Sequence, residues 1–391
     1  MGNVRTLPHP GGWNPQASRT PEERGWWKRL AITALCLAAS ACGSRESEAG
    51  SNPSFSLALL DSVTLEESDT AYLGAPLHVS AGRDGSLFVS DGLRSQVLQF
   101  SRRGDLIRAF GRPGQGPGEL AGPSATTVVG DSLLVIAEWG NGRTSVFDVK
   151  TGAFRRAVPH EGLPFSMEAR GDTVWISNVN IARKTSLSAW PTAQSAMRYF
   201  GEVPKEYHDS PALMEFHPYA TVALVADTLV VGFTGHRALF RTTMDGAAFD
   251  TVEIPAVRRR GVPHDIVARF AKDPRGISNE EVASMASALV GLHALSSGEI
   301  AAVHLDVRLE GKQITADGFV SILSKDLTRA CVDIPLALSK DGRPAVAFRG
   351  DTLIVVEQRV VAAERAVSYA RSYLLDSSGC EWVPVGPAPR R

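Results

Sequence analysis

Short β-rich runs alternate with tight turns along most of the chain. A turn that pairs an acidic residue with Gly or Ala is followed each time by apolar and β-branched residues, and another short apolar run precedes it. A strand, a two-residue turn and a second strand form the strongest short-range hairpin signal. The pattern therefore predicts six β-hairpins, whose turns carry the acidic residues Asp84, Asp131, Asp172, Asp227, Glu299 and Asp351.

Two further strands follow the hairpin in the copies that are easiest to read. Residues 97–100 are followed by residues 106–110, and residues 145–148 by residues 154–158, with a polar turn inside each pair. Repeats of about 40 to 50 residues with four strands each are typical of propeller blades. The pattern therefore predicts an all-β fold, a six-bladed β-propeller of four-stranded antiparallel blades over residues 54–391.

Three segments depart from this regularity. A further strand over residues 55–65 precedes the first blade, and we expect it to pair with the last blade and close the ring; a seven-bladed ring that counts this segment separately is the alternative. Ser278 and Glu281 form a capping box ahead of apolar residues at helical spacing, which predicts a short helical insertion near residues 278–291. Residues 184–218 are rich in aromatic side chains and indicate a second insertion, which either caps the ring or contributes to a binding face.

The first 41 residues have the layout of an export signal. A basic pair at residues 28–29 precedes an apolar run over residues 30–41, which is 12 residues long, whereas a bilayer-spanning helix needs about 20. Residues 39–41 are small, and Cys42 follows them. This sequence resembles the lipobox of bacterial lipoproteins, in which the signal is removed before a cysteine that then receives lipid. The departure from that pattern is Ala39, where Leu is commonest.

The resemblance implies a lipoprotein-type signal peptide over residues 1–41 and lipidation of Cys42. Residues 42–53 contain no large apolar side chain, and we expect them to form a flexible tether. The expected location is the bacterial cell envelope, where the exported protein is held at a membrane surface by its lipid. A plain secreted protein, cut by the ordinary signal peptidase, is the alternative.

Composition and charge narrow the classes of partner. Hydrophobic residues make up 43 % of the chain, which is enough for the core of a globular protein. The 41 basic and 42 acidic residues leave a net charge of −1, so we expect no nucleic-acid partner. We expect a monomer whose contact with the membrane is its lipid anchor.

Cys331 and Cys380 are the cysteines outside the signal and the lipidation site. Exported proteins occupy compartments in which disulfides form. Cys331 is expected in a late strand of the fifth blade and Cys380 at the matching position of the sixth. Packed sheets lie about 10 Å apart and a disulfide needs Cα atoms within about 7 Å, so a bridge requires the two strands to lean together. A disulfide and two separate thiols are both open at this stage.

A Phe-Gly pair, a Gly/Pro-rich link and a new blade follow one another at residues 110–120. With Val89-Ser90-Asp91 before it and Asn141-Gly142-Arg143 after it, this stretch resembles the NHL-repeat group of six-bladed β-propellers. The likeness is clear over residues 76–150 and returns weakly near residues 345–357. It implies the propeller fold and a recognition surface, in a group whose members differ widely in function.

Familiar catalytic signatures are absent from the sequence. The glycine-rich residues 114–118 lack the helix and the Lys that follow a phosphate-binding loop, and neither His-Glu-x-x-His nor Gly-x-Ser-x-Gly occurs. Residues 258–260, three consecutive arginines, are expected in a solvated loop. The repeated turn acids are explained by turn geometry, because Gly and Asp both tolerate positive φ. We therefore assign no catalytic residue and no cofactor from the sequence.

One set of polar residues lies at the ends of the second strands, which approach one mouth of a propeller channel. Carboxylates, an amide and an imidazole there suit a divalent cation, and the gluconolactonase-like propeller enzymes hold their metal with similar groups. The alternative is that these side chains bind the backbone of neighbouring loops. Phe233 interrupts the pattern in the fourth blade. The candidate ring consists of Asp91, Glu138, Asn178, His304 and Glu357.

Two functional hypotheses follow. The first is a membrane-anchored cell-envelope lipoprotein whose propeller is a binding or scaffold module for a protein, peptide or carbohydrate. The second is a metal-dependent propeller hydrolase or lyase of the gluconolactonase-like kind, which depends on the strand-end ring.

Overall fold

A computed structural model describes residues 56–205, 207, 219–247, 249–273, 278, 281, 284–310, 313–339, 344–362 and 365–386. The chain divides after Asn52, and every described residue belongs to the second unit, Pro53–Arg391. The predicted signal, Cys42 and the tether lie outside the described residues. Among the residues that are described, no helix is long and apolar enough to cross a membrane.

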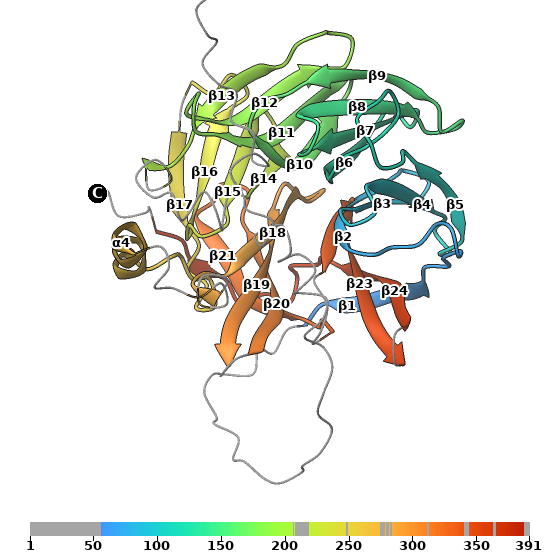
Figure 1. Ribbon diagram of the computed structural model, residues 1–391. Coiled ribbons are helices and arrows are strands. Elements are labelled where there is room, and N and C mark those ends of the chain that lie inside the picture. Colours follow the sequence, from blue (N-terminus) through green and yellow to red (C-terminus); the bar gives the residue numbers. More distant parts are fainter. Residues whose placement is uncertain are drawn as a thin grey trace, which may run out of the picture. The chain divides into compact units, whose positions relative to one another are not determined.

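The strands form six antiparallel sheets, arranged around a common centre (Figure 1). Blade one contains β2 (Pro76–Ala81), β3 (Leu87–Asp91), β4 (Gln96–Phe100) and β5 (Leu106–Phe110), and blade two contains β6 (Pro123–Val129), β7 (Leu133–Glu138), β8 (Arg143–Asp148) and β9 (Phe154–Pro159). Blade three contains β10 (Leu163–Arg170), β11 (Thr173–Asn180), β12 (Thr185–Pro191) and β13 (Arg198–Glu202), and blade four contains β14 (Ala220–Val225), β15 (Thr228–Phe233), β16 (Ala238–Thr243) and β17 (Phe249–Glu253).

The last two blades include strands from the ends of the described chain. Blade five contains β18 (Ala288–Ala294), β19 (Ile300–Glu310), β20 (Gln313–Leu323) and β21 (Arg329–Leu336), with β25 (Val383–Pro384) as a fifth strand at its edge. Blade six contains β22 (Ala345–Arg349), β23 (Thr352–Ala362), β24 (Arg365–Leu374) and β1 (Ala58–Thr64). The predicted six-bladed propeller is confirmed, and its first strand pairs with the last blade as expected, from Ala58 opposite Leu374 to Thr64 opposite Tyr369.

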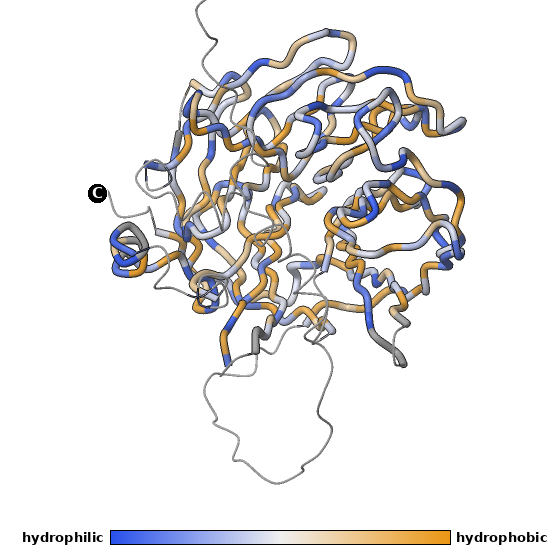
Figure 2. The backbone as a smooth tube through the Cα atoms, in the orientation of Figure 1, coloured by the Kyte–Doolittle hydropathy of each residue, from blue (hydrophilic) through white to orange (hydrophobic). Residues whose placement is uncertain are grey.

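The hydrophobic core consists of six clusters, one between each pair of neighbouring blades. Successive side chains of a strand point to opposite faces of its sheet. Adjacent residues of the second strand of a blade therefore pack in the two different interfaces that the blade forms with its neighbours. In β3, Phe88 packs toward blade two and Val89 packs toward blade six. Figure 2 shows hydrophobic positions along strands throughout the propeller. Each blade therefore buries both of its faces, which only a closed ring allows.

The predicted helix over residues 278–291 is wrong in its second half. Ser278 Oγ accepts a hydrogen bond from the Glu281 N–H at 3.1 Å, as a helix cap does. However, residues 288–291 begin β18, the inner strand of blade five, and Leu289 packs in the core between blades four and five. A short apolar run fits a helix and a buried strand equally well, and here the closure of the ring selects the strand. The helix α4 (His264–Lys272) was not predicted.

The predicted insertion over residues 184–218 is also wrong where the structure describes it. Thr185–Pro191 and Arg198–Glu202 are the third and fourth strands of blade three, so the aromatic side chains there pack within and beside a regular blade. Trp190 and Phe200 belong to its two hydrophobic interfaces. Residues 206 and 208–218 lie outside the described residues.

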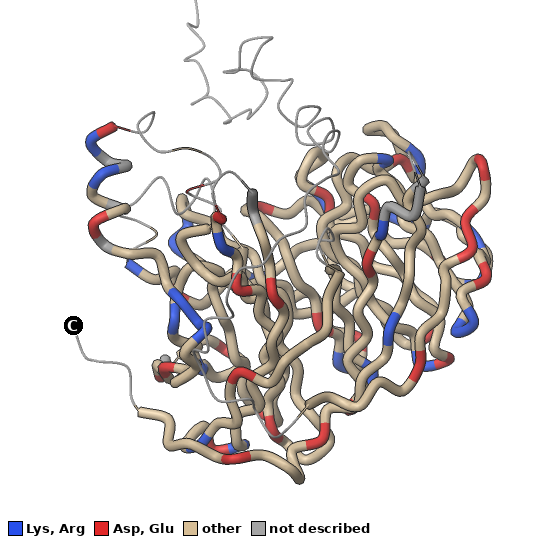
Figure 3. The backbone as a smooth tube through the Cα atoms, turned by 90° about the horizontal axis from the view of Figure 1, so that it is seen from below, with Lys and Arg blue, Asp and Glu red and all other residues tan. Residues whose placement is uncertain are grey.

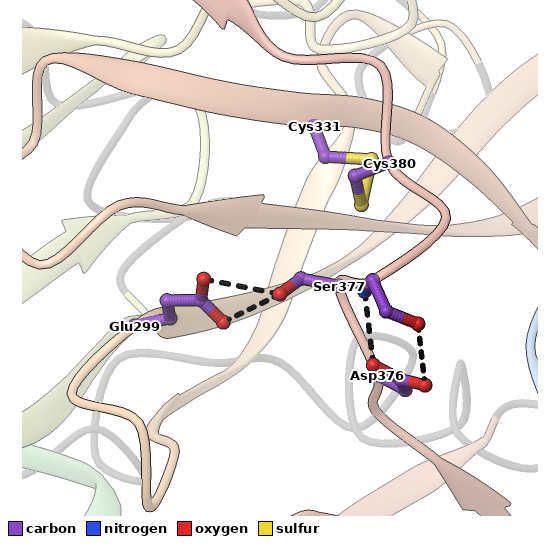
Figure 4. The surroundings of a disulfide bond; sticks show 6 residues. Glu299, Cys331, Asp376, Ser377 and Cys380 are labelled. Carbon is purple, nitrogen blue, oxygen red and sulfur yellow. Dashed lines mark hydrogen bonds between the residues drawn. A yellow bond between two sulfur atoms is a disulfide. The ribbon is translucent and has the colours of Figure 1, made fainter.

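The C-terminal segment crosses from blade six to blade five. After β24 it passes Ser377, whose Oγ donates to the Glu299 carboxylate at 2.9–3.0 Å, and then reaches Cys380, which forms a disulfide with Cys331 of β21 (Figure 4). The Cα atoms are 5.6 Å apart. The expected position of Cys380 on a strand of blade six is incorrect, because it lies in this crossing segment. The segment ends by pairing β25 with β21.

We predict that replacing both cysteines, C331S/C380S, lowers the free energy of unfolding. The bridge closes a loop of 49 residues, and the loop-entropy model gives about 4 kcal/mol for that length. Urea unfolding under non-reducing conditions measures the change, and peptide mapping without reduction should find the 331 and 380 peptides linked. Unlinked peptides, or a double variant as stable as the wild type, would contradict the prediction.

Candidate functional site

The inner strands of the six blades surround a central channel. β2, β6, β10, β14, β18 and β22 contact one another in sequence, and β22 returns to β2. They enclose a cavity of about 370 Å³ that is lined by residues from all six blades and extends to the hairpin turns at one end. This volume lies within the range of small-molecule sites.

Blades one to three contribute polar groups to the channel wall. They include His78 and Ser80 of β2 and Ser166 of β10, whereas Thr126 of β6 is fully buried beside His78 and Ser80. The Ser80 and Thr126 hydroxyls are 2.9 Å apart, and the Thr126 N–H donates to His78 Nδ1 at 3.3 Å. Ser166 Oγ accepts from the Val222 N–H of the next blade at 3.0 Å. These bonds connect inner strands across blade boundaries.

His78 offers a hydrogen-bond donor to the channel. Burial lowers the pKa of its imidazole from 6.5 to about 4, so the ring is neutral at pH 7. Because Nδ1 accepts from Thr126, the proton of the neutral ring is on Nε2. No hydrogen bond to Nε2 is formed by the described residues.

Blades five and six contribute both apolar and polar side chains to the wall. Val290 and His293 of β18 and Phe348 and Arg349 of β22 line the cavity and are partly exposed. Val222 of β14 and Val346 of β22 are buried in the interfaces between blades. Val290 sits at a β-bulge, where the register of β18 against β19 shifts between Leu289 and Gly291. The channel wall is therefore mixed, with the apolar Val290 and Phe348 beside the polar His293 and Arg349.

A polar bridge crosses the channel near the hairpin turns. His293 of blade five lies with Nδ1 3.5 Å from the Glu168 carboxylate of blade three, and its Nε2–H donates to the Gly350 carbonyl of blade six at 3.1 Å. The ring also stacks on Phe348, with centroids 4.7 Å apart and planes 6° apart. Each ring nitrogen therefore faces a hydrogen-bond acceptor. Beyond this bridge, Arg83 pairs with Asp131 at the solvent-exposed mouth.

The strand-end ring proposed from the sequence does not form a common site. Among the described residues, no three His, Cys, Asp or Glu side chains are grouped so that they could hold a metal ion. Asp91 accepts from the N–H groups of Gly74, Ala75, Leu93 and Arg94. Each ring carboxylate is bound to the loops of its own blade, which agrees with the alternative interpretation.

Glu138 and Glu357 are likewise bound to loops and side chains of their own blades. Glu138 accepts from the Ala121 N–H at 3.0 Å, from Arg143 Nε at 3.1 Å and from Asn141 Nδ2 at 2.6 Å. Glu357 accepts from the Ser339 N–H at 2.7 Å and forms an ion pair with Arg371. These buried carboxylates hold the loop that leads into the inner strand against the end of the second strand.

Asn178 and His304 are the remaining two residues of the candidate ring. Asn178 donates to the Glu161 carbonyl, and its Oδ1 has no hydrogen-bond partner in the described structure. The His304 ring is fully buried and stacks on Phe319 with centroids 4.7 Å apart. Burial, with a smaller contribution from Arg259, holds the pKa of His304 well below its ordinary value.

The arginine run at residues 258–260 is not the solvated loop that the sequence indicated. Arg259 is 1 % exposed and donates to the backbone carbonyls of Ser287, Phe233 and His236. Arg260 forms a 3.0 Å ion pair with Asp306, whose side chain is fully buried. Blade four has Phe233 at the position where other blades have a residue of the candidate ring. There the Arg259 guanidinium joins the loops by donating to backbone carbonyls, whereas the carboxylates of other blades accept from N–H groups.

Backbone groups of the glycine-rich link at residues 114–118 are hydrogen-bonded to side chains of the protein. The Glu119 carboxylate accepts from the Gly116 N–H at 2.8 Å. Arg143 donates to the carbonyls of Gln115, Gly116 and Glu119 at 2.7–2.9 Å and thereby holds the link against blade two. The turn acids are explained by their turns, as at Gly130 and Asp131, which both have φ of 56°.

Comparisons with known proteins show the fold and leave the family open. No family model matches the sequence. A segment of 83 residues is 34 % identical to peptidyl-glycine alpha-amidating monooxygenase B of Xenopus laevis; the match covers 20 % of this chain, and the chain spans about a tenth of that protein's length.

Two solved structures superpose on most of the chain. A DUF4221-family protein from Bacteroides vulgatus has a TM-score of 0.58 at 10 % identity, over 85 % of this chain and 98 % of that one. A Bacteroides fragilis protein described as exported has a TM-score of 0.54 at 9 % identity, over 81 % and 94 %. At such identities the likeness concerns the fold alone.

We predict that acidification from pH 7 to pH 5 destabilises the propeller through its buried imidazoles. Burial lowers the pKa of both His78 and His160 from 6.5 to about 4, so the unfolded chain binds protons more readily than the folded one. The free energy of unfolding therefore has its full value above about pH 6.5 and falls as the pH decreases toward 4. At pH 5 each histidine costs about 2 kcal/mol.

Urea unfolding at pH 7 and pH 5 checks this, with H160Q as the comparison. The variant should lose less stability between the two pH values than the wild type. Asp326 does not titrate in this range, because hydrogen bonds from Ser324 and Thr328 lower its pKa from 3.8 to about 2. Equal losses for wild type and variant would show that His160 is not responsible.

Proposed function

We propose that this protein is an exported, lipid-anchored binding module of the cell envelope, whose ligand site is the central channel of an NHL-type propeller. The observation that carries the binding role is the cavity of about 370 Å³, in which all six blades meet. Cavities that combine apolar walls with a few convergent polar groups are the usual small-molecule sites.

The polar groups of the channel support a binding role. The His78 Nε2–H is available as a donor, and the Ser80 and Ser166 side chains line the same cavity. They are positioned by hydrogen bonds between blades, so the site is formed before a ligand arrives. Preformed polar groups bind with a smaller entropic cost than mobile ones.

Export and anchoring are supported by the sequence and by one structural neighbour. The basic pair, the 12-residue apolar run and Cys42 give the order of a lipoprotein signal. The Bacteroides fragilis neighbour is described as exported, and the disulfide is of the kind found in oxidising compartments. The likeness of residues 76–150 to NHL repeats supports the propeller type.

The metal-dependent hydrolase or lyase is the weaker hypothesis. Its proposed ligands, including Asp91, Glu138 and Glu357, are each saturated by loop N–H groups or arginines of their own blade. To bind a metal ion, these carboxylates would have to give up the bonds that hold the entry loop of each blade against its second strand.

A Cys42→Ser variant tests the anchor. We predict that wild-type protein has a mature N-terminus at Cys42 with the mass of attached acyl chains, and that C42S is released or left unprocessed. Durable attachment needs more than one chain, since a single chain binds membranes only marginally. The matched control is C36S, which should be processed and lipidated normally. Cleavage elsewhere, or an unmodified Cys42, would refute the anchor.

A channel-filling variant tests the binding site. A thermal-shift screen with soluble sugars, amino acids, short peptides, organic acids and nucleotides should find compounds that stabilise the wild type. A ligand at 100 times its Kd adds about 2.7 kcal/mol. Val290→Trp places an indole in the cavity and should abolish the shift, whereas Ile107→Trp, on an exposed outer strand, should retain it.

Val290→Phe replaces the larger substitution if V290W does not fold, as judged by circular dichroism. A shift that persists in the filled channel would place the ligand elsewhere on the protein. A screen in which no compound stabilises the wild type would remove the support for a small-molecule site.

A further inference from the structure

The outer strand of blade six is exposed on both faces. β1 pairs with β24 on one side, and no described strand pairs with its other edge (Figure 1). Six of its seven residues are exposed. The outer strands of blades one to three, by contrast, each bury at least one residue, namely Phe110 of β5, Val158 of β9 and Phe200 of β13. β1 is therefore an outer strand that the packing of the ring leaves uncovered.

Three exposed leucines lie at the start of this strand. Leu59 and Leu60 are each 55 % exposed, and Leu374 of β24 is 36 % exposed. Leu374 lies opposite Ala58, and the register shifts between Leu59 and Asp61, so Leu60 is the extra residue of a β-bulge. A bulge redirects side chains, and here two successive leucines both reach solvent. We call Leu59, Leu60 and Leu374 the β1 leucines.

The β1 leucines follow the proposed lipid anchor closely in the sequence. Ala58 comes sixteen residues after Cys42, and a fully extended chain of that length spans at most about 55 Å. The composition of residues 42–53 predicts a flexible chain, for which the root-mean-square span is only about 20 Å. A compact domain of the size of the propeller is about 50 Å across. The lipid on Cys42 would therefore hold the start of β1 nearer to the bilayer than most of the propeller surface.

We infer that the propeller rests on the surface of a phospholipid bilayer through the β1 leucines. This inference goes beyond the proposed function and rests on its lipid anchor. Exposed apolar side chains that lie together mark contact sites, and leucines are suited to the boundary between lipid headgroups and acyl chains. The free backbone edge of β1 stays among headgroups and water, because unpaired N–H and C=O groups cannot enter the hydrocarbon.

Apolar contact, rather than charge, is what this surface offers to lipid. Asp61 is exposed on β1, and Arg102 and Arg103 are exposed in the turn that meets the segment after β1, where the Glu66 N–H donates to the Gly104 carbonyl at 2.8 Å. Figure 3 likewise shows charged residues of both signs interspersed over the propeller. We therefore expect the contact to be independent of the amount of anionic lipid.

The β1 leucines lie at the end of blade six at which the channel opens. Thr352, which follows the turn at Gly350 and Asp351, pairs with Leu374, and Gly350 lines the cavity. The Leu375 N–H also donates to the Asp351 carbonyl at 2.8 Å. Contact with lipid would therefore turn this end of blade six toward the bilayer.

Quenching by spin-labelled lipids tests the contact. The acylated protein is purified from membranes with the substitution Leu60→Cys; in the mature chain this thiol is free, whereas Cys42 carries lipid and Cys331 is bonded to Cys380. A fluorophore at position 60 is compared with one at Leu93→Cys, because Leu93 is 72 % exposed in the turn between β3 and β4. In phosphatidylcholine vesicles that contain nitroxide-labelled lipid, we expect quenching at position 60 and not at position 93. Added phosphatidylglycerol should leave the quenching unchanged.

Two double variants separate apolar contact from mere proximity to the anchor. In a chain labelled at Leu374→Cys, the substitutions L59D/L60D should abolish the quenching, because carboxylates disfavour the acyl region of the bilayer. The matched control is L93D/I107D, which changes two exposed apolar residues of blade one and should retain the quenching. Circular dichroism checks that both variants fold.

The outcomes separate the contact from the anchor. A mature N-terminus without acyl chains would overturn the anchor and this inference together. An acylated chain that is quenched equally at positions 60 and 93, or whose quenching requires phosphatidylglycerol, would leave the anchor in place and overturn the apolar contact through β1. Energy transfer between labels on different molecules, without quenching by lipid, would show that a second copy covers β1 and would overturn the contact as well. Quenching at position 374 that only L59D/L60D abolishes would support it.

Discussion

Every blade of this propeller has two apolar faces, and the burial of both faces is the constraint on which the rest of the structure depends. Phe88 and Val89, adjacent in β3, pack toward different neighbours, and six clusters fill the six interfaces. A blade at the end of an open row would expose one face, so the ring has to close. β1 closes it by completing blade six, and the C-terminal segment adds a second link by crossing to blade five, where β25 and the disulfide fasten it.

Ring closure also explains the polar residues at the strand ends. In blades one, two and six, N–H groups of the loop that enters the inner strand face the end of the second strand and need acceptors. Asp91, Glu138 and Glu357 supply them from the end of the adjacent strand. In blade two, the Asn141-Gly142-Arg143 motif continues this system, because Arg143 binds both Glu138 and the carbonyls of the glycine-rich link. In blade four, Arg259 joins the loops by donating to carbonyls, whereas the carboxylates of blades one, two and six accept from N–H groups.

The channel is the place where the closed ring brings distant residues together. His78 and Thr126 are 48 residues apart, and Glu168 and His293 come from blades that are not neighbours. Its wall combines residues of all six blades, a combination that no single repeat carries. Hydrogen bonds between inner strands fix its polar groups in place, so the same contacts that join the blades also shape the site.

The sequence by itself determined the number of blades, the position of each hairpin and the strand that closes the ring. These depend on turn residues and on alternation within a few positions, which are local signals. Tertiary structure decided between strand and helix at residues 288–291, because that apolar run fits both and only the ring needs an inner strand there. It also buried Arg259, placed Cys380 in the segment that crosses to blade five, and bound the carboxylates of the candidate ring to separate loops. The channel wall could not be predicted from sequence patterns for the same reason: its residues come from six different repeats, and only the closure of the ring makes them a single surface.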